Sequence, residues 1–96
     1  MSLFILLLLS SSSTLQAQET KRTSAFNLVA AAYRGRFNQW GIPAYAKLDQ
    51  AYRGKQITAS DLVKAAVEAN RLSPDALKDK AYIDAVDTNL YGLVTR

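Results

Sequence analysis

The chain has 96 residues, a net charge of +4 at pH 7, and neither cysteine nor histidine. This length fits one modest domain, and the missing residue types exclude disulfides, thiolate or imidazole metal sites and thiol nucleophiles. The sequence also lacks a phosphate-binding glycine loop and a nucleophile elbow. We therefore expect a protein that is not an enzyme and that has no catalytic residue, no metal and no cofactor.

The N-terminus carries an apolar run that ends in four serines, residues 10–13, and is followed by the small residue Ala17. This pattern predicts a secretory signal peptide over residues 1–17, although no Lys or Arg precedes the run. A retained membrane anchor and a buried helix are the alternatives, but the run is shorter than the roughly 20 residues of a bilayer span. We expect an exported protein.

Residues 18–24 are polar and are expected to form a flexible leader that ends in a helix cap at Ser24. A single helical domain is predicted for residues 25–96. Its first helix begins after Ser24, and Gly35 is expected to end or bend it. One apolar stripe of this helix is predicted to face the core; it consists of Phe26, Val29, Ala30, Tyr33 and Phe37.

The second helix is predicted over residues 43–53, with Pro43 in its first turn. Tyr45, Leu48 and Tyr52 form its apolar stripe. Asp49 and Arg53 are four residues apart and are expected to form a surface ion pair.

The third helix is predicted over residues 59–71, after a capping box formed by Thr58 and Asp61. Its apolar face is wide, and Leu62, Ala65, Ala66 and Ala69 form it, while its charged residues lie on the opposite side. It is expected to be the central helix.

The fourth helix is predicted to begin at Ser73 with Pro74 in its first turn, and Gly92 is expected to fray its end. Its inward face consists of Tyr82, Ile83, Val86, Leu90 and Leu93. Its acidic residues are expected to form a solvated helix face rather than a metal site. The predicted fold is all-α, a small bundle of about four short helices with short connections.

One four-residue pattern occurs twice, as residues 32–35 and 51–54 (Ala-Tyr-Arg-Gly). We interpret both copies as helix ends, with a base at the negative end of the helix dipole and glycine at the stop. A duplicated ligand-contacting turn is the alternative.

Positive charge is concentrated in the first half of the chain. Residues 20–55 hold seven bases and one acid, a net charge of +6, whereas residues 56–96 have a net charge of −1. Aromatic residues lie among these bases, which is typical of surfaces that bind anions. The candidate partner-binding residues are Arg34, Arg36, Trp40, Arg53 and Lys55. An ordinary solvated face is the alternative, and Trp40 either closes the end of the core or contacts a partner.

The stretch of residues 25–45, followed by residues 57–63 and 70–74, resembles small exported cyanobacterial proteins of unassigned role. The resemblance implies a periplasmic or thylakoid-lumen location and no mechanism. The leading hypothesis is a non-enzymatic accessory or interaction protein that binds an acidic protein through its basic, aromatic-rich face. The alternative is a peripheral binder of anionic membrane surfaces, and no nucleic-acid partner is expected for an exported protein.

Overall fold

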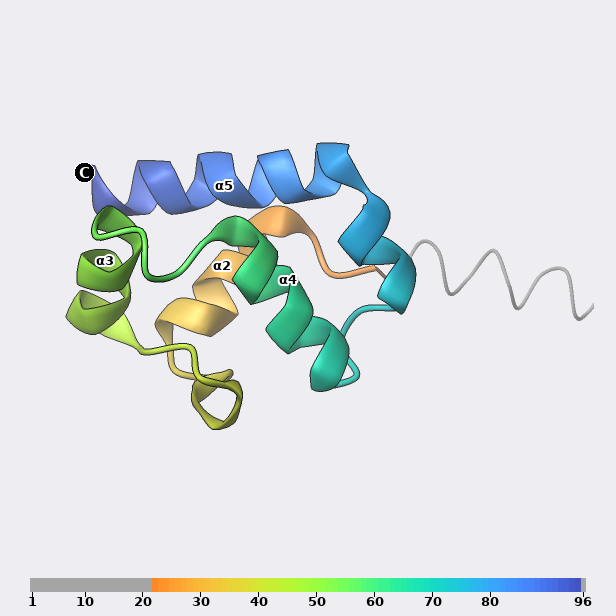
Figure 1. Cartoon of the computed structure of the whole chain (residues 1–96), viewed down its shortest axis with the longest axis horizontal. Helices are drawn as coiled ribbons and strands as arrows, with labels where there is room; N and C mark the ends of the chain where they lie inside the picture. Colours follow the sequence, from red (N-terminus) through yellow and green to blue (C-terminus); the bar gives the residue numbers. More distant parts are fainter. Residues whose placement is uncertain (1–21, 96) are drawn as a thin grey trace, which may run out of the picture.

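The computed structural model describes residues 22–95, and in that range the chain is helical and contains no strand. The predicted all-α bundle is confirmed. The predicted signal peptide and the leader residues 18–21 lie outside the described residues. The elements along the chain are α2 (Ala25–Tyr33), η1 (Asn38–Trp40), α3 (Tyr45–Arg53), α4 (Ala59–Glu68), η2 (Pro74–Lys78) and α5 (Lys80–Val94) (Figure 1).

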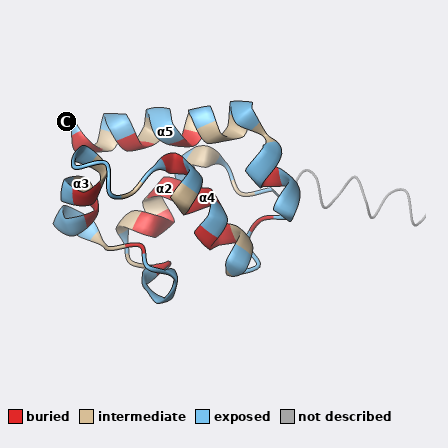
Figure 2. Ribbon diagram, in the orientation of Figure 1, coloured by how far each residue is buried: buried red, intermediate tan, exposed pale blue. Residues whose placement is uncertain are grey.

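Helix α5 organises the bundle because α2, α3 and α4 all contact it, and α2 also contacts α4. Figure 1 shows α5 along one side of the molecule, and in Figure 2 the buried positions of α5 lie on the side that faces the other helices. The largest side chains of the core are fully buried; they are Phe37, Leu28, Leu48, Leu62, Leu90, Val63 and Val86. The core thus draws on all four α-helices and on the turn after α2.

Side-chain caps begin three of the helices. The Ser24 hydroxyl accepts a hydrogen bond from the N–H of Asn27 at 3.1 Å, which starts α2 as predicted. The capping box predicted for α4 is present, with the N–H of Thr58 donating to the carboxylate of Asp61 at 2.9 Å.

The helix predicted to start at Ser73 is divided into two parts. Residues 74–78 form the short η2, and Asp79 then leaves the helical conformation with ψ of 91°. The Asp79 carboxylate accepts a hydrogen bond from the N–H of Tyr82 at 3.1 Å and caps α5. The prediction of one continuous segment is therefore wrong, because Asp79 supplies a second helix start inside it.

Helices α2, α3 and α4 end with the same hydrogen-bonded turn. In each, the residue after the C-cap is left-handed: Gly35 at φ 87°, Lys55 at φ 62° and Asn70 at φ 61°. The next N–H then returns to a carbonyl five residues earlier, as from Arg71 to Ala66 at 2.8 Å. The third helix consequently ends at Glu68 rather than at the predicted residue 71.

Both copies of the repeated pattern lie at helix ends, as we interpreted them. They are out of register by one residue, because Gly35 follows the C-cap of α2 whereas Gly54 is itself the C-cap of α3. The repeat therefore reflects a shared helix-stop chemistry rather than a duplicated unit.

The prediction for the inward face of the first helix is confirmed for Val29 and Phe37, which are buried, and is wrong for Phe26. Leu28, Ala31 and Ala32 are buried, whereas Phe26 is 67% exposed. Helix α2 also ends at Tyr33, so that Phe37 reaches the core from the following turn and not from the helix. Ala30 and Tyr33 are only partly buried, although Tyr33 packs against the core, so the helix turns the Phe26 end of the predicted stripe toward solvent.

Helix α3 begins at Tyr45 rather than in the predicted first turn at Pro43, and Tyr45 is 55% exposed rather than inward. The predicted ion pair of Asp49 and Arg53 does not form. Instead the Arg53 guanidinium donates to the carbonyl of Val94 at 2.9 Å, and the Tyr52 hydroxyl donates to Asp87 at 2.8 Å. These two hydrogen bonds join α3 to the C-terminal half of α5.

Candidate functional site

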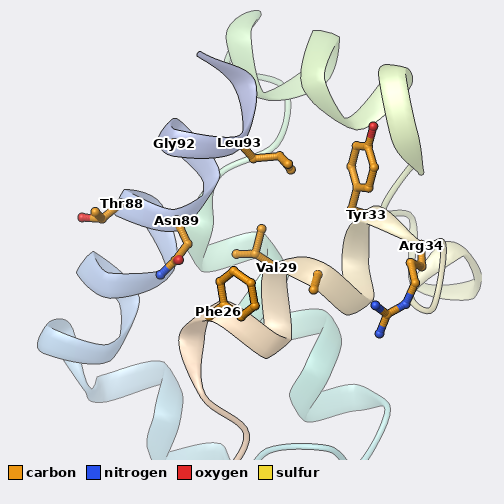
Figure 3. A pocket seen from close by; sticks show the side chains of 9 residues that line it. Phe26, Val29, Tyr33, Arg34, Thr88, Asn89, Gly92 and Leu93 are labelled. Atoms are coloured by element: carbon orange, nitrogen blue, oxygen red, sulfur yellow. The ribbon is translucent and has the colours of Figure 1, made fainter. Parts of the chain in front are cut away.

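A groove of about 430 Å³ lies between α2 and α5 and is the main candidate site (Figure 3). We call it the α2–α5 groove. Helix α2 contributes Phe26, Val29, Ala30, Tyr33 and Arg34, and α5 contributes Thr88, Asn89, Gly92 and Leu93. Most of this lining is apolar, and its volume is in the range of ordinary ligand and peptide sites.

Helix α2 lines the groove with apolar side chains that lie on the side opposite its most deeply buried residues. At 100° per residue, Phe26, Ala30 and Tyr33 point away from the side that buries Leu28 and Ala32. We call these three residues the outer face of α2. A helix that is apolar on all sides is usually covered on all sides. Within the described chain, α5 covers only part of the outer face and leaves Phe26 exposed.

Two small residues keep the groove open. Ala30 lies on α2, and Gly92 lies within α5, where a methyl group added to its backbone would meet nothing within 4 Å. Glycine in a helix interior costs roughly 0.5–1 kcal/mol relative to alanine. No special backbone angle requires glycine at position 92. Its missing side chain instead leaves open space beside the groove.

Arg34 is the one charged residue that lines the groove. No ion pair of Arg34 occurs in the described part of the chain. The polar side chains across the groove donate hydrogen bonds within α5. The Thr88 hydroxyl donates to the carbonyl of Asp84 at 3.0 Å, and the Asn89 side-chain amide donates to the carbonyl of Ala85 at 2.8 Å. The groove therefore presents an apolar surface with a single cation, and in Figure 3 Arg34 lies on the side away from Thr88 and Asn89.

The apolar surface continues from the groove toward α3. The ring of Tyr45 meets that of Tyr33 edge to face, with 5.1 Å between the ring centres. Such a contact stabilises both rings in place while leaving more than half of Tyr45 exposed. Phe26, Tyr33 and Tyr45 thus provide three aromatic groups along one side of the molecule.

The chain that enters α2 is fixed to the start of α5. The Arg22 guanidinium pairs with Asp79 at 2.9 Å and lies 4.5 Å from the centre of the Tyr82 ring, whose hydroxyl donates to the carbonyl of Thr23. The N–H of Tyr82 and the Arg22 guanidinium hold the pKa of Asp79 below its usual range. Within the described residues, contacts with α5 therefore begin at Arg22, three residues before the predicted domain boundary at residue 25.

The five predicted partner-binding residues lie in different places. Arg34 lines the α2–α5 groove, whereas Arg53 and Lys55 line a second cavity beside the end of α5. Trp40 is 37% exposed, meets the buried Phe37 edge to face, and lines a third cavity with α4 residues. Arg36 is exposed and lines none of these three cavities.

Of the nine residues that line the groove, the prediction named only Arg34 as part of a site and missed the other eight. Phe26 and Leu93 were assigned to the core by helical periodicity, and Gly92 was interpreted as a fraying helix end. One signal was present in the sequence: between Ala25 and Tyr33 the only polar residue is Asn27. Such a segment predicts a helix with apolar groups on two sides.

The remaining titratable groups of residues 22–95 lie outside the groove. No group of three or more acidic side chains in this range is placed to hold a metal ion. Burial and the hydrogen bond to Asp87 raise the pKa of Tyr52 to about 12, so that its phenol stays protonated at neutral pH. Nor is any helix in the same range long and apolar enough to cross a membrane.

Comparison with known proteins found no match to a protein-family model, a curated protein or a solved structure.

Proposed function

We propose that this chain is a non-enzymatic accessory or interaction protein of an exported compartment, periplasm or thylakoid lumen, that binds an acidic protein partner. The α2–α5 groove is the binding surface. The observation that carries this proposal is the uncovered apolar outer face of α2 next to Arg34, which has no ion pair in the described structure.

Apolar burial supplies the affinity in this proposal. Phe26 is 67% exposed, and a partner that covers its ring gains on the order of 1–2 kcal/mol from that side chain alone. Exposed aromatic residues beside a well-formed concave surface are typical contributors to protein binding. Tyr33 and Tyr45 extend the same surface.

Positive charge favours an acidic partner over a basic one. Arg34 lies in the groove, while Arg36 and Lys55 lie outside it on the same basic half of the chain, whose residues 20–55 carry a net charge of +6. Such charges mainly accelerate association, and their effect weakens as salt rises. Arg53 has a different role, because its guanidinium is bonded to Val94 and joins α3 to α5.

Site-specific crosslinking tests the proposal. A photoreactive phenylalanine at position 26 should capture the native partner in the producing cells, whereas the same group at Lys78, an exposed residue of η2, should not. Arg34→Glu should weaken the capture from position 26, and Lys78→Glu should leave it unchanged. Equal capture from both positions, or capture that is insensitive to Arg34→Glu, would contradict the proposal.

Anionic membrane surfaces are the second candidate, because Phe26, Tyr45 and Arg34 combine exposed aromatic and basic groups on neighbouring elements. Flotation with vesicles distinguishes the two. Binding to anionic vesicles that is lost in Arg34→Glu and absent with neutral vesicles would favour the membrane.

A further inference from the structure

We infer that the segment bound in the α2–α5 groove is a short amphipathic helix of the partner, about two turns long, with a carboxylate placed opposite Arg34. This inference rests on the proposed function and names the form of the partner that the groove fits. It follows from the dimensions of the groove, from its small residues and from its single charge.

The dimensions match a helix lying beside α2 and α5. From Phe26 to Arg34 the outer face spans eight residues, or roughly 12 Å along the helix axis. A partner helix presents apolar side chains to such a face at positions i, i+3 or i+4, and i+7. At 5.4 Å per turn, about two turns of that helix span the length from Phe26 to Arg34.

The small residues set the depth of the contact. Ala30 and Gly92 line opposite sides of the groove, one on α2 and one on α5. Helix axes approach to roughly 8 Å where the facing residues are small, and to roughly 10 Å where they are large. A leucine or phenylalanine of the partner therefore fits above Ala30 and Gly92, in the position that a larger residue at 92 would occupy.

The charge distinguishes between possible occupants. No acidic residue lines the groove, so a partner carboxylate at its end meets Arg34 without a competing anion. The apolar residues 1–17 of this chain contain no Asp or Glu, so that segment has no carboxylate to offer Arg34. A second copy joined groove to groove brings another Arg34 and no acid, which opposes a symmetric dimer at this surface.

Stapled helical peptides test the inference directly. A staple is needed because helices of about twelve residues are marginal alone in water. Three labelled peptides share one leucine stripe and differ at a single position opposite Arg34, which is Glu, Gln or Lys. Fluorescence anisotropy with the full chain should show the Glu peptide binding about two- to fivefold more tightly than the Lys peptide, in the range of an exposed ion pair.

Two variants make the result specific. Arg34→Glu should reverse the order of the Glu and Lys peptides, and Gly92→Leu should weaken all three at least about tenfold, because its side chain fills the groove. Lys78→Glu is the matched control and should change nothing. Should Gly92→Leu fail to give a helical spectrum, Phe26→Ser provides the second test of the same surface.

Three outcomes would overturn the inference: no saturable binding of any peptide, equal binding of all three, or unchanged binding to Gly92→Leu. If position 26 crosslinks to the native partner while the peptides do not bind, the proposed function is supported, but the inference that the bound segment is a helix is wrong. If position 26 gives no crosslink, the proposed function itself fails. Sedimentation of the free chain could also depend on its concentration and lose this dependence in Phe26→Ser. That result would show that a second copy of the chain, and not a partner helix, occupies the groove.

Discussion

Helices α4 and α2 are nearly equal in length, at ten and nine residues, but they bury their surfaces differently. In α4 the buried Leu62 and Val63 lie opposite the exposed Ser60 and Lys64. In α2 the side opposite the buried Leu28 carries Phe26 and Tyr33 instead of charged residues. An apolar stripe therefore identifies the buried face of a helix only when the opposite face is polar.

The largest effect is expected in α4. Leu62→Ala removes a side chain with 0% exposure and should lower the free energy of unfolding by about 2–5 kcal/mol, from lost burial and from the cavity left behind. Urea denaturation followed by circular dichroism measures this change. If the free energy of unfolding falls by less than about 1 kcal/mol, the Leu62 face of α4 is not buried in the core.

The capping box gives the next largest effect. Thr58→Ala removes the side chain that accepts the N–H of Asp61 and should cost about 1 kcal/mol. Ser60→Ala is the matched control, since Ser60 is exposed on the same helix and should change stability by less than about 0.5 kcal/mol. Equal effects of the two substitutions would show that the box does not stabilise α4.

Glycine 92 should respond in the opposite direction. Gly92→Ala should raise the free energy of unfolding by about 0.5–1 kcal/mol, because the added methyl group meets no neighbour and alanine favours the helix. Gly35→Ala is the contrast: Gly35 has φ of 87° and its new methyl group would lie 3.0 Å from Asn38, so stability should fall. Thermal melts of the two variants should move in opposite directions.

Acid should have the smallest effect, at the contact that fixes the chain before α2. The pKa of Asp79 is held below its usual range by the N–H of Tyr82 and by Arg22, so the carboxylate stabilises the fold at pH values above about 4, its ordinary range. That contribution should be lost only as the pH falls below this range. Asp79→Asn should be less stable than the parent at neutral pH, and the difference should shrink at low pH; a constant difference would contradict this assignment.

Much of the fold could be predicted from local patterns, because these patterns depend on neighbouring residues alone. The caps at Ser24 and Thr58 and the stop after Arg53 follow from side chains that bond the adjacent backbone. The second start at Asp79 was hidden by the equally good signal of Ser73 and Pro74. When two valid helix starts lie six residues apart, the sequence does not show which one begins the long helix, because packing decides this.

The site was harder to predict because it depends on how α2 is rotated. The exposed state of Phe26 and the position of Arg34 in the groove depend on contacts of α2 with α4 and α5, which its own sequence does not specify. Arg53 shows the same limit: its spacing predicted an ion pair with Asp49, but the carbonyl of Val94 is its partner. Of the five predicted residues, Arg34 alone lines the α2–α5 groove.

We propose above that Phe26, on the outer face of α2, binds a partner and does not belong to the core, and Phe26→Ser tests this most directly. Stability and binding are measured on the same variant, by urea denaturation and by affinity for the acidic stapled peptide. The free energy of unfolding should change by no more than about 0.5 kcal/mol, since Phe26 is 67% exposed, while the affinity for the peptide should fall at least about tenfold. Destabilisation of about 2 kcal/mol or more, or unchanged affinity, would contradict it.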